Sequence, residues 1–217
     1  MSPGYLEFEA GMQFDARNDL GHDGCAFLTT KLGLTPTVQL SWFTAAVQLS
    51  HAAGGVRDVG VGLKWRVADQ QKMLGDFALL PIVKFPSGSA TAGSGTGTID
   101  ATLLLLSSRN LGVVHLDMNL GVTWRSGNGS LAPTSASLWR AAFSGTLQGP
   151  LAWAVEVHGF PGTTGPAGSG TTIGLFADVG YTVSPSLVLD FGSIVPVSGG
   201  QPRSLYAGLT WNAGKLW

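Results

Sequence analysis

Long segments in which apolar and polar residues alternate one by one are the feature that most limits what this chain can fold into. Residues 5–16, 59–67 and 114–125 each place apolar side chains at every second position. Successive side chains of a β-strand point to opposite faces, so a period of two predicts strands. Weaker alternation predicts further strands near residues 25–34, 37–49, 76–86, 98–107, 137–148, 151–160, 172–183, 186–196 and 204–213. We therefore expect residues 1–217 to form a single all-β domain of about twelve strands.

The composition indicates that these strands face a membrane. Charged residues make up 12% of the chain, about half of the share that soluble domains carry. The mean hydropathy is +0.25, yet no apolar stretch approaches the roughly 18–20 residues that a membrane helix needs. Most of the predicted strands are close to the roughly 9–11 residues with which a tilted strand crosses the hydrocarbon layer. If the chain spans a membrane, it does so with strands.

The placement of charges predicts which face meets the lipid. Most acidic and basic residues fall on the polar phase of the strands or in connections, so the apolar phase is almost free of charge. A Lys or Arg at the lipid-facing midplane costs about 2–4 kcal/mol. We therefore expect the apolar face to meet acyl chains and the charged face to line the lumen.

The connections alternate between long and short. The long ones are expected near residues 16–24, 50–57, 87–97, 126–136, 161–171 and 197–203. Outer-membrane barrels have short periplasmic turns and longer extracellular loops, and an even strand count returns both chain ends to the periplasmic side. The sequence thus predicts a transmembrane, antiparallel, up-and-down β-barrel in a bacterial outer membrane.

Several functional classes find no support in the sequence. The net charge of −1 and the lack of Lys/Arg-rich runs argue against a nucleic-acid partner. The single cysteine, Cys25, excludes an internal disulfide framework. The first residues have the alternation of a strand and lack the basic and apolar regions of a secretory signal. We therefore expect the signal peptide to be absent from this chain. No cofactor motif is found, and the expected partners are the lipid bilayer and a small-molecule solute, with no prediction for oligomeric state.

Five segments are similar to one family of bacterial outer-membrane proteins: residues 4–11, 59–67, 78–89, 115–122 and 206–211. The family is the outer-membrane transporter family linked to the meta-cleavage (MetA) pathway of phenol degradation. The internal Leu-Pro followed by Pro-Ser-Gly in residues 78–89 is the most specific part of the resemblance. The resemblance implies a barrel that passes small aromatic or other hydrophobic compounds, and it implies no catalytic residues. Such barrels usually close on a terminal aromatic, whereas Trp217 follows Lys215, so we expect residues 214–217 to overhang the barrel and Trp211 to seal it.

Charged residues on the polar phase are the candidate site. We predict that these polar side chains line the lumen: Glu7, Glu9, Lys64, Arg66, His115, Asp117, Arg125, Arg140, Glu156 and Asp178. Charges of both signs can brace the barrel wall as a network, or they can form a constriction that selects solutes. The expected function is passive passage of small solutes through a porin-like channel, and the alternative is a closed structural barrel without transport.

Pro81 lies inside a predicted strand, on the lipid-facing phase, and cannot donate a ladder hydrogen bond. It predicts a local gap that is either a sideways exit for a hydrophobic solute or a tolerated irregularity without function.

The sequence supports an enzymatic function less well than a channel. His115 and Asp117 share one face and could support acid–base chemistry, which makes an outer-membrane lipid hydrolase the rival class. No serine is in phase with this pair on its strand, so we expect no enzyme. His158 and Glu156 are too few for a metal site, and none is expected.

Overall fold

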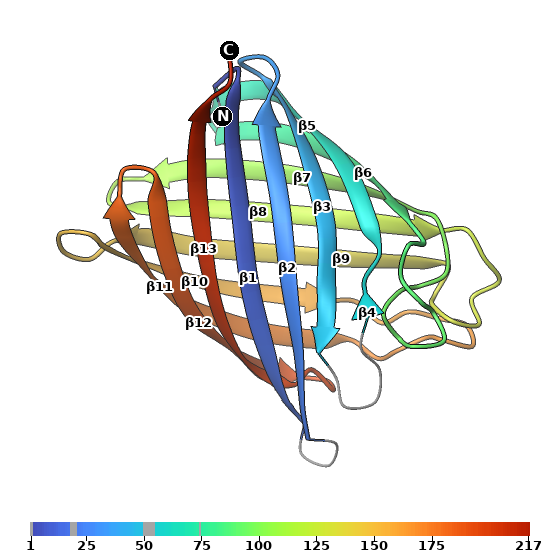
Figure 1. Cartoon of the computed structure of the whole chain (residues 1–217). Helices are drawn as coiled ribbons and strands as arrows, with labels where there is room; N and C mark the ends of the chain where they lie inside the picture. The colour runs from blue at the N-terminus through green and yellow to red at the C-terminus, as the bar shows by residue number, and fades with distance from the viewer. Residues whose placement is uncertain (1, 18–20, 50–54, 74) are drawn as a thin grey trace.

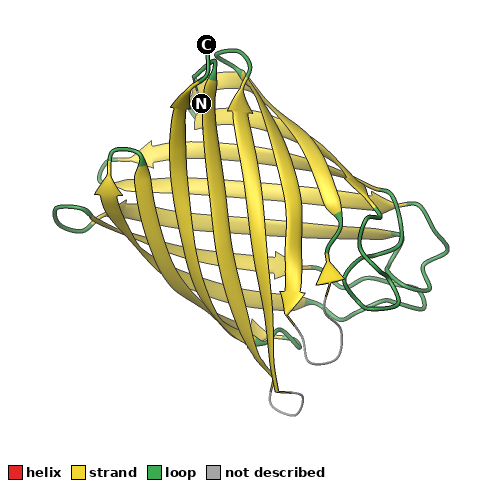
Figure 2. Cartoon of the chain, viewed as in Figure 1, coloured by secondary structure: helices red, strands yellow, loops and turns green. Residues whose placement is uncertain are grey.

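The chain folds into a tube of β-strands (Figures 1 and 2). This is a computed structural model, and it describes residues 2–17, 21–49, 55–73 and 75–217. Its strands are β1 (Tyr5–Arg17), β2 (Gly21–Gly33), β3 (Val38–Leu49), β4 (Gly55–Val56), β5 (Val59–Gln71), β6 (Gly75–Phe85), β7 (Asp100–Leu111), β8 (Val114–Arg125), β9 (Ser135–Thr146), β10 (Leu151–Phe160), β11 (Thr172–Ser184), β12 (Leu187–Ser198) and β13 (Arg203–Lys215). In the described part of the chain, no helix has the length and apolar character to cross a membrane.

The strands close into a barrel. Each long strand pairs antiparallel with the next long strand along the chain, and β1 pairs with both β2 and β13. The two-residue strand β4 only extends the edge of β3. The predicted up-and-down barrel of twelve long strands is therefore confirmed. The predicted bounds of two strands, residues 114–125 and 151–160, coincide with β8 and β10.

Apolar side chains cover the outside of this barrel. Leu63, Trp65 and Val67 of β5 are exposed, whereas Gly60 and Gly62 of the same strand are buried. Among the described residues, Ala78 is the one buried hydrophobic side chain. A soluble barrel of this size would bury many large apolar side chains in its core. The pattern fits a protein whose outer surface meets lipid.

The inside of the barrel is not uniformly polar. A Cβ atom added at Gly62 would lie 3.0 Å from the side chains of Leu80 and Ile82, and one added at Gly121 would lie 3.0 Å from Leu138. Gly62 is in phase with Lys64, which lines an internal cavity, so these leucine and isoleucine side chains lie on the lumenal side. The expectation that ionic groups alone face the interior is therefore incomplete, because β6 to β9 add an apolar patch.

The two ends of the barrel differ. Residues 34–37, 112–113, 147–150 and 185–186 form short connections at the end where both termini lie, which we call the turn end (Figure 1). Residues 86–99, 126–134 and 161–171 form long connections at the opposite end, the loop end.

Two expectations about chain segments are wrong. The expected long connection at residues 16–24 is mostly strand, because β1 and β2 remain paired up to Arg17 and Gly21, and only residues 18–20, outside the described part, separate them. The tail at residues 214–217 does not simply overhang. Lys215 pairs with Tyr5, and the backbone N–H of Leu216 donates to the carbonyl of Gly4 at 2.8 Å.

Pro81 interrupts one strand ladder without shifting it. It pairs with Leu103 on the β7 side. On the β5 side the ladder runs from the pair Gly62–Ile82 to the pair Trp65–Leu79 in one register, and the two intervening pairs are missing. The lack of an N–H on proline explains this interruption. The local gap is thus a pair of unmade ladder contacts rather than a bulge.

Candidate functional site

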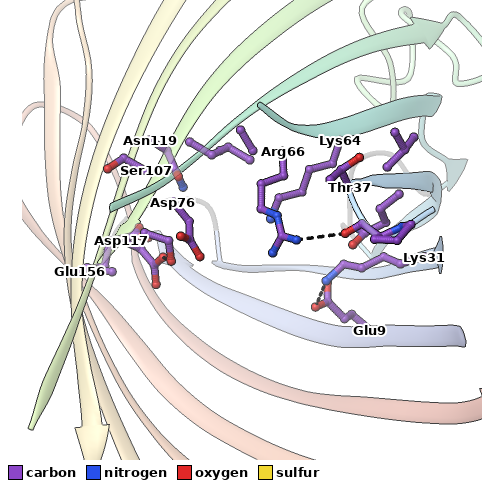
Figure 3. A pocket seen from close by; sticks show the side chains of 17 residues that line it. Glu9, Lys31, Thr37, Lys64, Arg66, Asp76, Ser107, Asp117, Asn119 and Glu156 are labelled. Atoms are coloured by element: carbon purple, nitrogen blue, oxygen red, sulfur yellow. Dashed lines mark hydrogen bonds and ion pairs between the residues drawn. The ribbon is translucent and has the colours of Figure 1, made fainter. Parts of the chain in front are cut away.

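The lumen contains a charged cavity at the turn end. This turn-end cavity has a volume of about 660 Å³. Its polar lining comes from eight different strands and the β2–β3 connection: Glu9, Lys31, Thr37, Gln39, Lys64, Arg66, Asp76, Ser107, Ser108, Asp117, Asn119 and Glu156. Figure 3 shows the side chains of Asp76 and Asp117 on one side of the cavity and those of Lys64 and Arg66 on the other. The two signs of charge therefore face each other across the space.

Ion pairs hold part of this lining in place. Lys31 of β2 bridges two carboxylates of β1, because its ammonium lies 3.2 Å from Glu7 and also bonds Glu9. Arg66 donates to the carbonyl of Pro36 at 3.1 Å and lies 2.9 Å from Asp69. Lys64 has no ion pair within 4.0 Å among the described residues. The cavity thus combines braced charges with one cation that is available to a solute.

A hydrogen-bond cluster at the edge of this cavity joins β7 and β8. Ser108 Oγ lies 2.9 Å from His115 Nε2, and His115 Nδ1 lies 2.6 Å from Asn110 Oδ1. A serine in contact with a histidine is the geometry of an activated nucleophile, and it was missed because the serine comes from the neighbouring strand.

The hydroxyl of Ser108 is nevertheless engaged elsewhere. It donates to Asp117 Oδ1 at 2.6 Å. A hydroxyl has a single hydrogen, and a carboxylate is the stronger acceptor. The Ser108 oxygen is then left to accept a hydrogen bond from His115 Nε2. Ser108 thus links His115 to Asp117 and joins β7 to β8, so the cluster braces the wall.

A second cavity lies at the loop end. The loop-end cavity, of about 590 Å³, is lined by strand residues, by Arg57 and Asp58 just before β5, and by residues 93–96 of the β6–β7 connection. Lys84 connects these parts, since it bonds Asp58, Thr96 and, at 3.2 Å, Asp100. Arg125 Nε lies 3.3 Å from the same Asp100 oxygen. This network fixes the β6–β7 connection over the lumen.

Asp58 anchors that connection from outside the spanning strands. Its carboxylate accepts hydrogen bonds from the backbone N–H groups of Gly88 and Thr96, both at 2.9 Å. Burial alone would raise the pKa of Asp58, but the hydrogen bonds from Lys84, Thr96 and Gly88 outweigh it and lower the pKa. The ionised form of Asp58 therefore stabilises the connection.

A third cavity is adjacent to the other two. This middle cavity has a volume of about 430 Å³ and shares Phe27 with the loop-end cavity and Glu156 with the turn-end cavity. Glu156 lies 3.7 Å from Arg140 and 3.1 Å from His158 Nδ1. On the other side of the ring, the side-chain amide of Gln201 contacts His158 Nε2, with its nitrogen at 2.9 Å and its oxygen at 3.3 Å.

The predicted site residues divide among these places. Glu9, Lys64, Arg66, Asp117 and Glu156 line the turn-end cavity, Arg125 lines the loop-end cavity, and Arg140 and Asp178 line the middle cavity. Glu7 and His115 line none of the three and instead bond residues that do, Lys31 and Ser108. In the part of the chain that the structure describes, no three His, Cys, Asp or Glu side chains are grouped to hold a metal ion.

Sequence reasoning missed the aromatic part of the lumen. Phe27, Phe176 and Tyr206 line the middle cavity, although apolar side chains were expected to face lipid. Their phase relative to Lys31, Asp178 and other polar residues of the same strands was the available signal.

Comparison with known proteins identifies the fold. No protein-family model and no curated protein matches the chain. The COG4313 outer membrane channel from Pseudomonas putida F1 superposes with a TM-score of 0.72 at 11% identity, covering 98% of this chain and 96% of that chain. The fold is that of an outer-membrane β-barrel.

Two further solved structures are similar over most of their length. The KdgM porin has a TM-score of 0.57 at 11% identity and covers 95% of this chain and 98% of its own. The translocator domain of the autotransporter NalP from Neisseria meningitidis has a TM-score of 0.51 at 11% identity, over 95% of this chain and 88% of that chain. Barrels of this shape therefore serve more than one task, and function has to be argued from the lumen.

Proposed function

We propose that the protein is a channel of the bacterial outer membrane through which small solutes pass passively. One observation carries the proposal: three cavities follow one another inside the barrel, and each neighbouring pair shares a lining side chain, Phe27 or Glu156. Such a sequence of cavities outlines a path from the loop end to the turn end. The apolar outer surface and the similarity to an outer membrane channel support the membrane location.

Small aromatic or other hydrophobic compounds are the solutes that we propose. The resemblance of five segments to the outer-membrane transporter family linked to phenol degradation implies such solutes. The interior supports the idea independently, since Leu80, Ile82 and Leu138 add an apolar patch to a charged lumen. A wall of mixed character can accept the ring of a solute on one side and its polar group on the other.

A sideways exit near Pro81 belongs to this proposal. The missing ladder pairs lie between β5 and β6, at the level of lumenal Lys64 and Leu80. A hydrophobic solute that leaves the lumen there would enter the acyl layer instead of crossing the turn end.

Planar-bilayer recording tests the channel. The purified protein should give discrete conductance steps, and Lys84→Met, which releases the β6–β7 connection, should change their size. A protein that inserts but conducts nothing, with and without this substitution, would identify the closed structural barrel as the correct alternative.

A further inference from the structure

The middle cavity has an aromatic wall. Phe27 of β2 stacks on Tyr206 of β13, with ring centroids 5.8 Å apart and an interplanar angle of 14°. Phe176 of β11 meets the same tyrosine edge-on at 5.9 Å. The three rings come from three strands, and Phe27 is far from the other two in the sequence. Together they form one continuous surface beside the lumen.

Glycines on the neighbouring strands make room for these rings. A Cβ atom at Gly11 would come within 2.6 Å of the Phe27 ring, and one at Gly192 would come within 2.5 Å of the Phe176 ring. The rings therefore lie against the backbone of the barrel wall instead of crossing the lumen. This placement leaves the cavity of about 430 Å³ open beside them.

The same cavity contains carboxylates in excess. Asp178, Asp190 and Glu156 line it, against the single guanidinium of Arg140. Arg140 and His158 are both engaged by Glu156, at 3.7 Å and 3.1 Å. No basic side chain lies within 4.0 Å of Asp178 or Asp190 among the described residues.

Asp178 and Asp190 are neighbours on one face of the wall. Asp190 pairs with Gly180 and Asp178 with Gly192 on the adjacent strands β11 and β12, so the two carboxylates are diagonal to each other. Tyr206 links them to the aromatic surface, because its hydroxyl and a carboxylate oxygen of Asp190 lie over the same backbone position, Gly208. Two carboxylates without a counter-ion, held beside exposed ring surface, are matched by a ligand that brings both a positive charge and an apolar body.

We propose that the middle cavity binds small organic cations, that is, an ammonium group attached to an aromatic or alkyl body. The ammonium would lie between Asp178 and Asp190, and the body would pack on Phe27, Phe176 and Tyr206. A small inorganic cation would gain the charge interaction but would leave the ring surface without a contact. A neutral aromatic would gain the rings but would leave the carboxylates unpaired.

This inference rests on the proposed channel, because a cation has to reach the cavity, but its test does not require conductance. Phenethylammonium, 2-phenylethanol and sodium are titrated into the purified detergent-solubilised protein by calorimetry. Phenethylammonium is expected to bind about tenfold more tightly than 2-phenylethanol, as one charge-assisted contact implies. Sodium is expected to compete only weakly.

Variants assign the binding to this cavity. Asp178→Asn combined with Asp190→Asn keeps the shape and removes the charge, and should weaken phenethylammonium binding about tenfold or more. Phe176→Leu should weaken it about threefold. Asp15→Asn is the matched control, since Asp15 lies on the same wall outside the three cavities and its neighbours Ser204 and Gln13 can still bond an amide. Its affinity should be unchanged.

The outcomes separate the two proposals. Equal affinities for phenethylammonium and 2-phenylethanol, or an unchanged affinity in the double Asn variant with native circular dichroism, overturn the organic-cation site even if the protein conducts. Binding that is lost only in the cavity variants supports the site even if planar bilayers show no conductance, in which case the proposed channel alone fails.

Discussion

The ammonium nitrogen of Lys84 lies 3.2 Å from Asp100 Oδ2 inside the loop end of the barrel. The Asp100 side chain is only 6% exposed, and it also lies 3.3 Å from Arg125 Nε. Asp100→Ala therefore leaves Arg125 without its anion, and Lys84 keeps only its ion pair with Asp58. We expect a loss of about 3–5 kcal/mol in the free energy of unfolding, as for other broken buried pairs.

Urea titration of the protein in detergent micelles, followed by circular dichroism, measures this loss. Asp69→Ala is the control, because Asp69 pairs with Arg66 at an exposed position and should lose less than about 1 kcal/mol. Similar losses in the two variants would contradict a special role for the Asp100 network.

Asp58 gives the β6–β7 connection a dependence on pH. Its pKa in the folded protein is below the ordinary value of 3.8, so the ionised carboxylate favours the closed connection. The stabilisation is complete at pH values above the ordinary pKa and is lost as the pH falls through the lowered pKa. Below about pH 4 we expect residues 86–99 to become more accessible to pepsin.

Limited pepsin digestion over a pH series measures the accessibility of the connection. In Asp58→Asn the carboxylate is gone, and cleavage within residues 86–99 should occur at every pH at which pepsin is active. If the wild type and Asp58→Asn are cleaved at the same rate across the series, Asp58 does not hold the connection.

The strands were largely predictable from the sequence, whereas the site was predictable only in part. The alternation in residues 114–125 specifies β8 because each face of a strand has one environment. Lumenal charges such as Lys64 and Glu156 follow from the same phase. The bridge from Ser108 to His115 and the stacking of Phe27 on Tyr206 depend on the register between strands, which no single segment encodes.

The start of β2 was missed for a local reason. The residues of Gly21–Gly24 contain two glycines and two polar residues, so they show no apolar phase, yet they pair with β1. The backbone ladder with β1 extends the hairpin there. Short polar extensions of this kind cannot be predicted from the alternation of apolar and polar residues.

Substitutions of Ser108 and His115 test the alternative that the protein is a lipid hydrolase. Because its hydroxyl donates to Asp117 at 2.6 Å, we expect no ester hydrolysis above the detergent background. The measurement is the release of p-nitrophenol from a short-chain and a long-chain p-nitrophenyl ester by the wild type, Ser108→Ala and His115→Ala. Activity present in the wild type and absent from both variants would establish the hydrolase, whereas equal rates in all three confirm the structural role of the cluster.

A substitution of Pro81 tests the proposed sideways exit of a hydrophobic solute into the membrane. Pro81→Val restores an N–H that can bond across to β5 and complete the interrupted ladder, so it should close the gap. We expect severalfold slower uptake of radiolabelled toluene by cells that produce the variant, with single-channel conductance unchanged, because the lumen itself is not altered. Leu79→Val, on the same outer face of β6 where the ladder is intact, is the matched control and should leave both quantities unchanged. Unchanged toluene uptake in a correctly folded Pro81→Val protein would mean that the interruption has no part in transport, and the solute would then have to leave through the turn end, past Lys64 and Arg66.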